Sequence, residues 1–475
     1  MLRLVMDDGP LQRSINRREI LRISGLAGLI SPFAAIGGTT SDATRLPGFG
    51  RAKSVIVVYA NGGQSQLETW DPKPHAPREI RGEFAAIPTA IPGYFCCEHL
   101  PRIAQIADRL CVIRSMSHED LDHGSAFYLS MTGRYHRRRS GNPLPSPDDF
   151  PCVSSVLQSI RPGSALGQAA VHLNGPAVVP LIEAPGQFGG FLGKGYDPLT
   201  IGDVTASHIP IPALEPMVDL AVPRLRRRES LRKQLEQAAH QLESVPPTID
   251  QETLYRNAFE LLTREETRAA FELHQEPDTV RDRYGRNRSG QACLLARRLA
   301  QAGVPLITVI WNHNNRGQDL DANDPDLYGW DTHNDIFSGL KNHLLPRFDQ
   351  SFSALIEDLD QRGMLESTLV ICLGEFGRAP LVAVEKNFAG AAPGRKHWSW
   401  VYSIAMAGAG IARGSIVGES DERGAYPRTE QFGPWDTVAT IFSALGIDPH
   451  QVYRDPLDRP VRICEGNVIT AAYQG

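Results

Sequence analysis

Histidine and acidic residues gather in short polar segments at widely separated points of this 475-residue chain. The segments are Ser117–His123, Trp330–His333, Gly374–Arg378 and Lys396–Trp398, together with the amide-bearing segment Asn61–Gly63. Neutral imidazoles and carboxylates are ligands of zinc, manganese and iron, and the same groups carry acid and base chemistry. If the fold brings these segments together, they can form a metal site or an acid–base site.

Near-continuous apolar runs indicate strands that are buried on both faces of a sheet. The runs are Ser54–Ala60, Leu110–Arg114, Ala170–Leu173, Pro305–Trp311, Thr368–Leu373 and Tyr402–Met406. Between them, apolar residues at helical spacing predict helices over Gly124–Met131, Gln291–Ala302, Ile336–Gln361 and Trp435–Leu445. The alternation of strands and helices predicts parallel crossover connections and a layered α/β fold.

Most of the polar segments follow these strands or lie in the loops beyond them. Asp331 and His333 lie beyond Pro305–Trp311, and Glu375 follows Thr368–Leu373. Residues two apart on extended backbone share a face, so the side chains of Asp331 and His333 can point the same way. Ligands of α/β proteins bind beyond the carboxyl ends of parallel strands. We therefore expect the site at that edge of the sheet.

Each polar segment also has a structural interpretation. Ser117–His123 can be a solvated polar turn ahead of the next helix. Thr332 or Asn334 can cap the helix that follows it, and Glu375 can form a simple ion pair with Arg378. The residues alone leave these alternatives open.

The beginning of the chain is typical of an export signal. Arg17 and Arg18 precede a mildly apolar stretch, Ile23–Gly38, and Ser41–Ala43 offers small residues for cleavage. This pattern predicts a twin-arginine signal over residues 1–43 and delivery of the mature protein to the periplasm or cell surface. No later segment reaches about 18 consecutive apolar residues, so we expect no stable membrane span.

Composition narrows the function further. The net charge of -5 gives no basic footprint for nucleic acid or an anionic membrane. The seven cysteines have no spacing typical of a zinc cluster, and Cys111 and Cys372 lie in apolar runs, where buried thiols are expected. We expect residues 44–475 to form a single α/β domain with a charged helical insertion near 214–245.

The chain contains five blocks that together resemble one bacterial family: Ala60–Pro74, Arg114–Gly133, Gly329–Asp335, Leu373–Pro380 and Gly394–Trp398. The family is the largely uncharacterised, sulfatase-like "domain of unknown function" family with twin-arginine signals, which resembles the alkaline phosphatase superfamily. The resemblance implies a three-layer α/β/α sandwich with a mostly parallel central sheet and one or two metal ions at the strand carboxyl ends.

The resemblance also implies which residues hold the metal. It assigns metal positions to Asn61, Asp331, His333, Glu375 and His397, and we add either His118 or His123 as a candidate ligand. These residue types suit zinc or manganese better than calcium, which prefers shells made only of oxygen.

The sequence departs from the sulfatase pattern at the nucleophile. No cysteine lies in a Cys-x-Pro-x-Arg motif, so we expect no formylglycine. The nucleophile position falls on His123, and Ser125 is near but offset. We therefore treat His123, Ser125 and Arg378 as the candidate catalytic residues.

Two hypotheses follow. In the first, the protein is an exported metal-dependent hydrolase of phosphate or sulfate esters, acting on a small-molecule or polysaccharide-derived substrate. In the second, it is a non-catalytic metal- or anion-binding scaffold that acts with other exported proteins. A scaffold needs no general acid and should tolerate His123→Asn with its metal retained.

Overall fold

The computed structural model of the chain describes residues 46–161, 169–179, 181–205, 269–316, 328–455 and 457–474. The export signal expected over residues 1–43 and the charged insertion expected near 214–245 lie outside these ranges, and both stay predictions. Among the helices within the ranges, none is long and apolar enough to cross a membrane.

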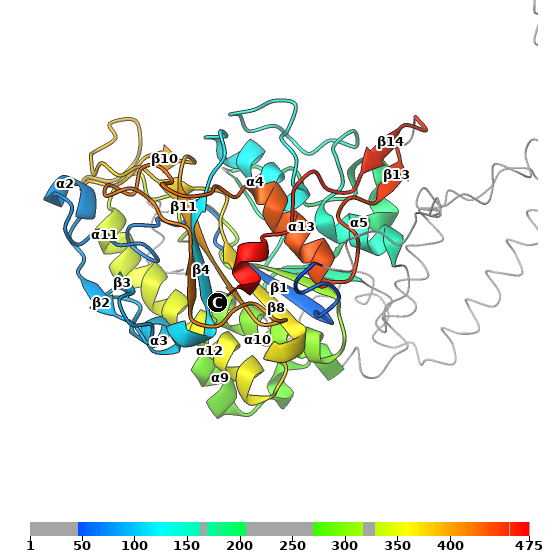
Figure 1. The fold of residues 1–475 in the computed structure, drawn as a ribbon, viewed down its shortest axis with the longest axis horizontal. Coiled ribbons are helices and arrows are strands. Elements are labelled where there is room, and N and C mark those ends of the chain that lie inside the picture. Colours follow the sequence, from blue (N-terminus) through cyan, green and yellow to red (C-terminus); the bar gives the residue numbers. More distant parts are fainter. Residues whose placement is uncertain are drawn as a thin grey trace, which may run out of the picture.

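Eight strands form the central sheet. They are β1 (Ser54–Tyr59), β4 (Cys111–Met116), β5 (Ala170–Leu173), β6 (Leu199–Ile201), β7 (Leu306–Ile310), β8 (Thr368–Leu373), β11 (Tyr402–Ala407) and β12 (Ser415–Val417). Their order is β12-β4-β11-β8-β1-β7-β5-β6, and Figure 1 labels β1, β4, β8 and β11 among them. Neighbouring strands are parallel except at β11, which runs antiparallel to β4 and β8. The predicted α/β fold with a mostly parallel sheet is confirmed.

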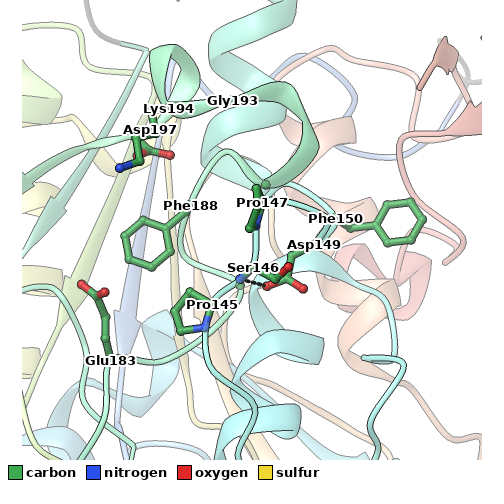
Figure 2. A pocket seen from close by; sticks show the side chains of 12 residues that line it. Pro145, Ser146, Pro147, Asp149, Phe150, Glu183, Phe188, Gly193, Lys194 and Asp197 are labelled. Atoms are coloured by element: carbon green, nitrogen blue, oxygen red, sulfur yellow. Dashed lines mark hydrogen bonds between the residues drawn. The ribbon is translucent and has the colours of Figure 1, made fainter. Parts of the chain in front are cut away.

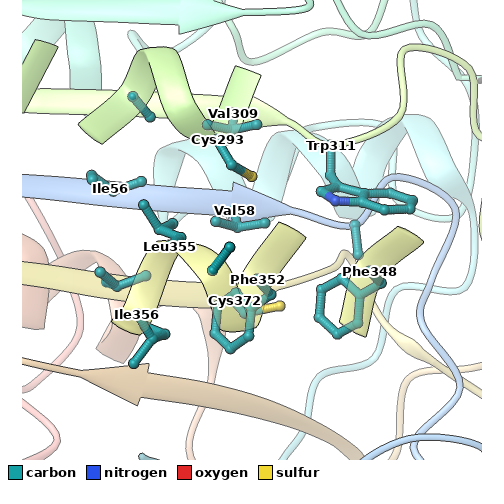
Figure 3. Packing of buried hydrophobic residues seen from close by; sticks show 14 of the residues in the cluster. Ile56, Val58, Cys293, Val309, Trp311, Phe348, Phe352, Leu355, Ile356 and Cys372 are labelled. Atoms are coloured by element: carbon teal, nitrogen blue, oxygen red, sulfur yellow. The ribbon is translucent and has the colours of Figure 1, made fainter. Parts of the chain in front are cut away.

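Helices cover both faces of this sheet because successive residues of a buried strand point to opposite sides. Ile56 and Val58 pack into a core with α3 (Pro101–Ile106), α10 (Arg288–Gln301) and α12 (Leu345–Gln361), part of which Figure 3 shows. Val55 and Val57 pack on the other face with α4 (His123–Thr132), α5 (Val153–Ile160) and α13 (Pro434–Ala444). The result is three layers, α/β/α.

The described part of the chain also contains smaller elements. They are the helices α2 (Arg78–Arg81), α9 (Asp278–Tyr284) and α11 (Ile336–Gly339), and the antiparallel pairs β2 (Ala86–Pro88) with β3 (Phe95–Cys97), β9 (Gly377–Arg378) with β10 (His397–Trp398), and β13 (Val452–Arg454) with β14 (Pro460–Arg462). The pair β9–β10 matters for the site, because it places Arg378 directly opposite His397.

One predicted helix is divided in the structure. The segment Ile336–Gln361 forms α11, a π-helical turn over Leu340–Leu344, and then α12. Pro346 lies in the first turn of α12 and has no N–H to donate to the preceding turn, so a regular α-helix cannot run through it.

All seven cysteines are buried and unbridged. The predicted burial of Cys111 and Cys372 is confirmed, and burial raises the pKa of both thiols, for Cys111 to about 11. These cysteines are therefore packing residues rather than reactive thiols.

A buried histidine makes the fold sensitive to acid. His172 on β5 is 1% exposed, its Nε2 lies 2.9 Å from the Ser154 hydroxyl, and burial lowers its pKa to about 3. The unfolded chain binds a proton at His172 below pH of about 6.5, whereas the folded chain does not, so stability is lost as pH falls from there toward 3.

We therefore expect His172→Asn to flatten the pH dependence of the free energy of unfolding. The slope between pH 6 and 4, measured by urea unfolding, should fall by up to about 1.4 kcal/mol per pH unit. The matched control, His75→Asn, replaces an exposed histidine and should leave the slope unchanged. Equal slopes for His172→Asn and the wild type would contradict this assignment.

Candidate metal centre

Four side chains from separate parts of the chain meet beyond the carboxyl ends of β1, β7 and β8. His123 is the first residue of α4, Asp331 and His333 lie in the loop between β7 and α11, and His397 lies in β10. One ligand atom from each of these residues lies within 4.8 Å of all the others. This is the edge of a parallel sheet at which α/β proteins bind ligands.

A glycine after β1 lets the loops approach this closely. Gly62 has a φ of 116°, and a Cβ at this position would lie 2.4 Å from the main-chain nitrogen of Asp331. A side chain there would push Asp331 away from the histidines.

Each of the three histidines directs its Nδ1 to a hydrogen-bond acceptor outside the cluster. The acceptor for His123 is Glu375 Oε1 at 2.6 Å. The Nδ1 of His333 lies 3.0 Å from Glu385 Oε2, and that of His397 lies 2.7 Å from the main-chain oxygen of Leu121. A ring that donates from Nδ1 carries its lone pair on Nε2, and this is the tautomer that metal-binding histidines adopt.

The three Nε2 atoms converge on Asp331. They lie 3.1 Å (His123), 2.9 Å (His333) and 3.3 Å (His397) from Asp331 Oδ1, and those of His333 and His397 are 2.9 Å apart. Ligands held about 2.0 Å from one tetrahedral ion lie about 3.3 Å from each other. The Nε2 atom of His123 is buried without a hydrogen-bond partner. Three lone pairs and a carboxylate oxygen therefore face one point, and the donor set fits a divalent metal ion such as zinc.

The charges around the cluster also favour a cation. Asp331 forms an ion pair with Arg378 at 2.7 Å, and Glu385 forms one with Lys396 at 2.9 Å. Glu375 has no such partner among these groups, although it accepts hydrogen bonds from the main-chain N–H of Gly62 at 2.9 and 3.1 Å. The three carboxylates thus outnumber the two side-chain cations by one, and a divalent ion would reverse the sign of the local charge.

Burial and the charges around the cluster shift the pKa values of its side chains. Burial opposes protonation of His123, but Asp331 and Glu375 outweigh it and raise its pKa to about 9. Burial and the neighbouring charge of His123 lower the pKa of His397 to about 3. Burial alone would raise the pKa of Asp331, yet His123 and Arg378 hold it well below its usual range. One cation, a proton or a metal, is thus favoured at the cluster.

Other candidate residues from the sequence lie outside the four-donor cluster. Glu375 orients His123 and holds Gly62, as described above. The His118 Nε2 donates to the main-chain oxygen of Glu375 at 2.7 Å, and its Nδ1 accepts from the Asp120 N–H at 3.1 Å. Burial lowers the pKa of His118 to about 4, so the ring is neutral and both nitrogens are in use.

Asn61 and Ser125 also point elsewhere. The Asn61 amide donates to the main-chain oxygens of Val178 and His313, both at 3.3 Å. The Ser125 hydroxyl donates to Asp120 Oδ1 at 2.6 Å and accepts from the Gly141 N–H at 3.2 Å. Neither side chain belongs to the four-donor cluster.

Three structural interpretations of the polar segments differ from what the structure shows. The N-cap of α11 is Asp335, and neither Thr332 nor Asn334 occupies that position. Arg378 pairs with Asp331 and not with Glu375. Ser117–His123 is not a fully solvated turn, because His118, Asp120 and His123 are buried, although Glu119 and Leu121 are exposed.

Glu385 and Leu121 were not candidates in the sequence. Glu385 lies in a loop without a periodic pattern, and Leu121 contributes a main-chain oxygen, which any residue could supply. The segment 117–123 placed Leu121 beside the site but gave no sign of its role.

A separate cavity of about 410 Å³ lies among the loops after α4 and β5 (Figure 2). Pro145, Phe188, Glu183 and Lys194 are among its lining residues, and none of the four cluster residues is. The cavity and the cluster are therefore different places on the molecule.

Comparison with known proteins gives a family and a set of loosely similar folds. The family described as "Protein of unknown function (DUF1501)" matches residues 52–473. No curated protein shows significant sequence similarity to the chain.

Among solved structures, Ps i-CgsB is 11% identical, with a TM-score of 0.42 over 88% of this chain and 75% of that chain. The PsFucS1 sulfatase from Pseudoalteromonas sp. is 14% identical (TM-score 0.36, 91% and 72% covered). The phosphonate monoester hydrolase SpPMH from Silicibacter pomeroyi is 12% identical (TM-score 0.34, 87% and 75% covered). Similarity this low identifies neither an activity nor a substrate.

The donor set predicts one divalent ion per chain. Saturating zinc at about a hundred times its dissociation constant should raise the free energy of unfolding by about 2.7 kcal/mol, measured by thermal unfolding with elemental analysis. His333→Ala should abolish both the stoichiometric metal and this stabilisation.

The matched control is His118→Gln, which changes a buried histidine outside the four-donor cluster. It should lower stability but keep the metal, because His118 has no free nitrogen to offer. Loss of metal from His118→Gln and retention by His333→Ala would refute the four-residue donor set.

Proposed function

Given that the chain belongs to the DUF1501 family of proteins of unknown function, we propose that it is a metal-dependent hydrolase of phosphate or sulfate esters that works without formylglycine. The observation that carries the proposal is the convergence of the Nε2 atoms of His123, His333 and His397 on Asp331 Oδ1. A divalent ion bound by these atoms would polarise an ester oxygen and lower the pKa of water.

The protein's own residues keep this arrangement rigid. Arg378 is fully buried and fixes the Asp331 carboxylate while donating to the main-chain oxygens of Gly62 and Gly63. Glu375 orients His123, and Glu385 orients His333. Preorganised ligands of this kind cost no rearrangement when a substrate binds.

Substrate would reach the cluster from the side of His397. The side chain of His397 is 18% exposed, whereas those of His123, Asp331 and His333 are 3%, 6% and 4% exposed. Because a divalent ion would make the local charge positive, an anionic ester suits the site better than a neutral one. This supports a phosphate or sulfate ester as substrate class.

Water is the proposed nucleophile. All seven cysteines are buried, and the Ser125 hydroxyl is bonded to Asp120 and Gly141. His123 directs Nδ1 to Glu375 and Nε2 to the cluster, so it serves as a ligand and has no nitrogen left to attack an ester. The reaction would therefore proceed without a covalent enzyme intermediate.

One observation favours a second function, a metal- or anion-binding scaffold that acts with other exported proteins. Four protein donors are typical of closed structural zinc sites, whereas catalytic sites usually keep one position for water or substrate. For hydrolysis, the four residues that would hold the ion would also have to leave room for water or the ester beside them.

The hydrolase proposal predicts turnover of simple esters. The protein loaded with zinc or manganese should hydrolyse some of a panel of phosphate and sulfate esters, and Asp331→Asn should lower the rate by about a hundredfold or more. Ser125→Ala should retain near-normal turnover, because its hydroxyl is not at the cluster. A stoichiometric metal without turnover of any ester would favour the scaffold, and loss of turnover in Ser125→Ala would restore a serine nucleophile.

We also propose that the protein is exported by the twin-arginine route, on the basis of Arg17, Arg18 and the small residues Ser41–Ala43. Changing both arginines to lysine keeps the charge but removes the guanidinium groups, so uncleaved precursor should accumulate in the cell. Cell fractionation with antibody detection measures this. Normal export of the double-lysine variant would contradict the proposed route.

A further inference from the structure

We propose that Phe388 and Leu121 bind the alcohol portion of the substrate, and that this portion carries a ring with an apolar face. The inference rests on the proposed hydrolase function and names the class of ester that the site would select. Phe388 stacks on the ligand His333, the main-chain oxygen of Leu121 bonds the ligand His397, and both residues are exposed.

Phe388 is attached to the cluster through a stacked pair. Its ring lies parallel to that of His333, with an interplanar angle of 9° and the centroids 3.7 Å apart. Only one face of the phenyl ring can contact His333, yet the residue is 39% exposed. Part of Phe388 is therefore exposed beside the cluster, and flat rings are the partners that an aromatic surface prefers.

Leu121 lies beside the ligand that is most open to solvent. Its main-chain oxygen accepts a hydrogen bond from His397 Nδ1 at 2.7 Å, while its side chain is 37% exposed. The centroids of the His397 and His333 rings are 4.6 Å apart, so Leu121 and Phe388 each contact one of two neighbouring ligands. An anion bound at the cluster would thus lie near two exposed apolar residues.

The loop that carries Phe388 is held firmly in place. The Asn334 amide donates to the main-chain oxygens of Glu385, Phe388 and Ala389 at 2.9, 3.2 and 3.0 Å, and its oxygen accepts from the Glu385 N–H at 2.8 Å. Asn334 directly follows the ligand His333, so the exposed phenyl ring and the cluster form one rigid unit. Exposing apolar groups on a rigid element without covering them is typical of a binding surface.

Together these features describe the substrate. Its anionic group would bind at the positively charged cluster, and its ring would lie against Phe388 with Leu121 on the other side. Aryl rings and the CH face of a pyranose both present such an apolar face, so the shared chemistry is a ring-bearing alcohol ester.

Binding of non-hydrolysable phosphonates to the zinc-loaded protein tests the inference without requiring turnover. Isothermal titration should show that phenylphosphonate binds about tenfold or more tightly than methylphosphonate, because the ring buries apolar area. The phosphonate analogue of glucose 6-phosphate serves as the sugar arm, and its affinity relative to phenylphosphonate tells which ring is preferred.

Single-residue variants show which side chains cause the preference for phenylphosphonate. Phe388→Ala and Leu121→Ala should each reduce the preference for phenylphosphonate severalfold while methylphosphonate binds as before. Leu121→Ala keeps the main-chain oxygen that orients His397. Its affinities therefore test the inference even if Phe388→Ala loses zinc. The matched control is Phe188→Ala, which changes a phenylalanine in the separate cavity (Figure 2) and should leave both affinities unchanged.

Equal binding of phenyl- and methylphosphonate, or loss of the preference in Phe188→Ala alone, would overturn the inference and leave the hydrolase proposal standing. Failure of all phosphonates to bind a protein that holds stoichiometric zinc would count against the hydrolase proposal itself.

Discussion

The structure around the site depends on the repulsion between three imidazole lone pairs and one carboxylate oxygen that face a common point. His123, His333 and His397 each direct Nδ1 to an acceptor outside the cluster, so each ring, when neutral, can turn an Nε2 lone pair toward Asp331. A buried arrangement of this kind is costly unless a cation lies at its centre. Without a cation at this point, Asp331 and Glu375 raise the pKa of His123 to about 9, so His123 takes up a proton.

Several unusual features of the fold support this arrangement of the four donors. Gly62 gives the room in which the loop after β1 passes Asp331, and the short pair β9–β10 sets Arg378 opposite His397. Arg378 in turn ties Asp331 to the main chain of the segment after β1. The segments that follow β1, β7 and β8 are thus joined through one buried guanidinium, which holds Asp331 in place.

The sequence predicted six of the eight strands, because these buried strands are continuous apolar runs whose bounds differ little from those observed, but it missed the short edge strands β6 and β12. It also placed Asp331 and His333 together, since residues two apart on extended backbone share a face. It made both His118 and His123 candidate ligands. Only the hydrogen bonds show that His118 is a neutral supporting ring and that His123 is the ligand. The role of Glu385 could not be predicted from the sequence, because its loop has neither a periodic pattern nor a motif. The role of the Leu121 main-chain oxygen could not be predicted either, because any residue supplies such an oxygen. The break before α12 follows from Pro346, although the π-helical turn ahead of it does not.

Anomalous X-ray scattering from crystals of the protein prepared with zinc would show whether these four side chains hold one metal ion. We expect one strong peak at the zinc edge, about 2.0–2.2 Å from Nε2 of His123, His333 and His397 and from an oxygen of Asp331. Well-ordered density for all four side chains with no metal between them, at a zinc concentration that saturates the protein in solution, would contradict it.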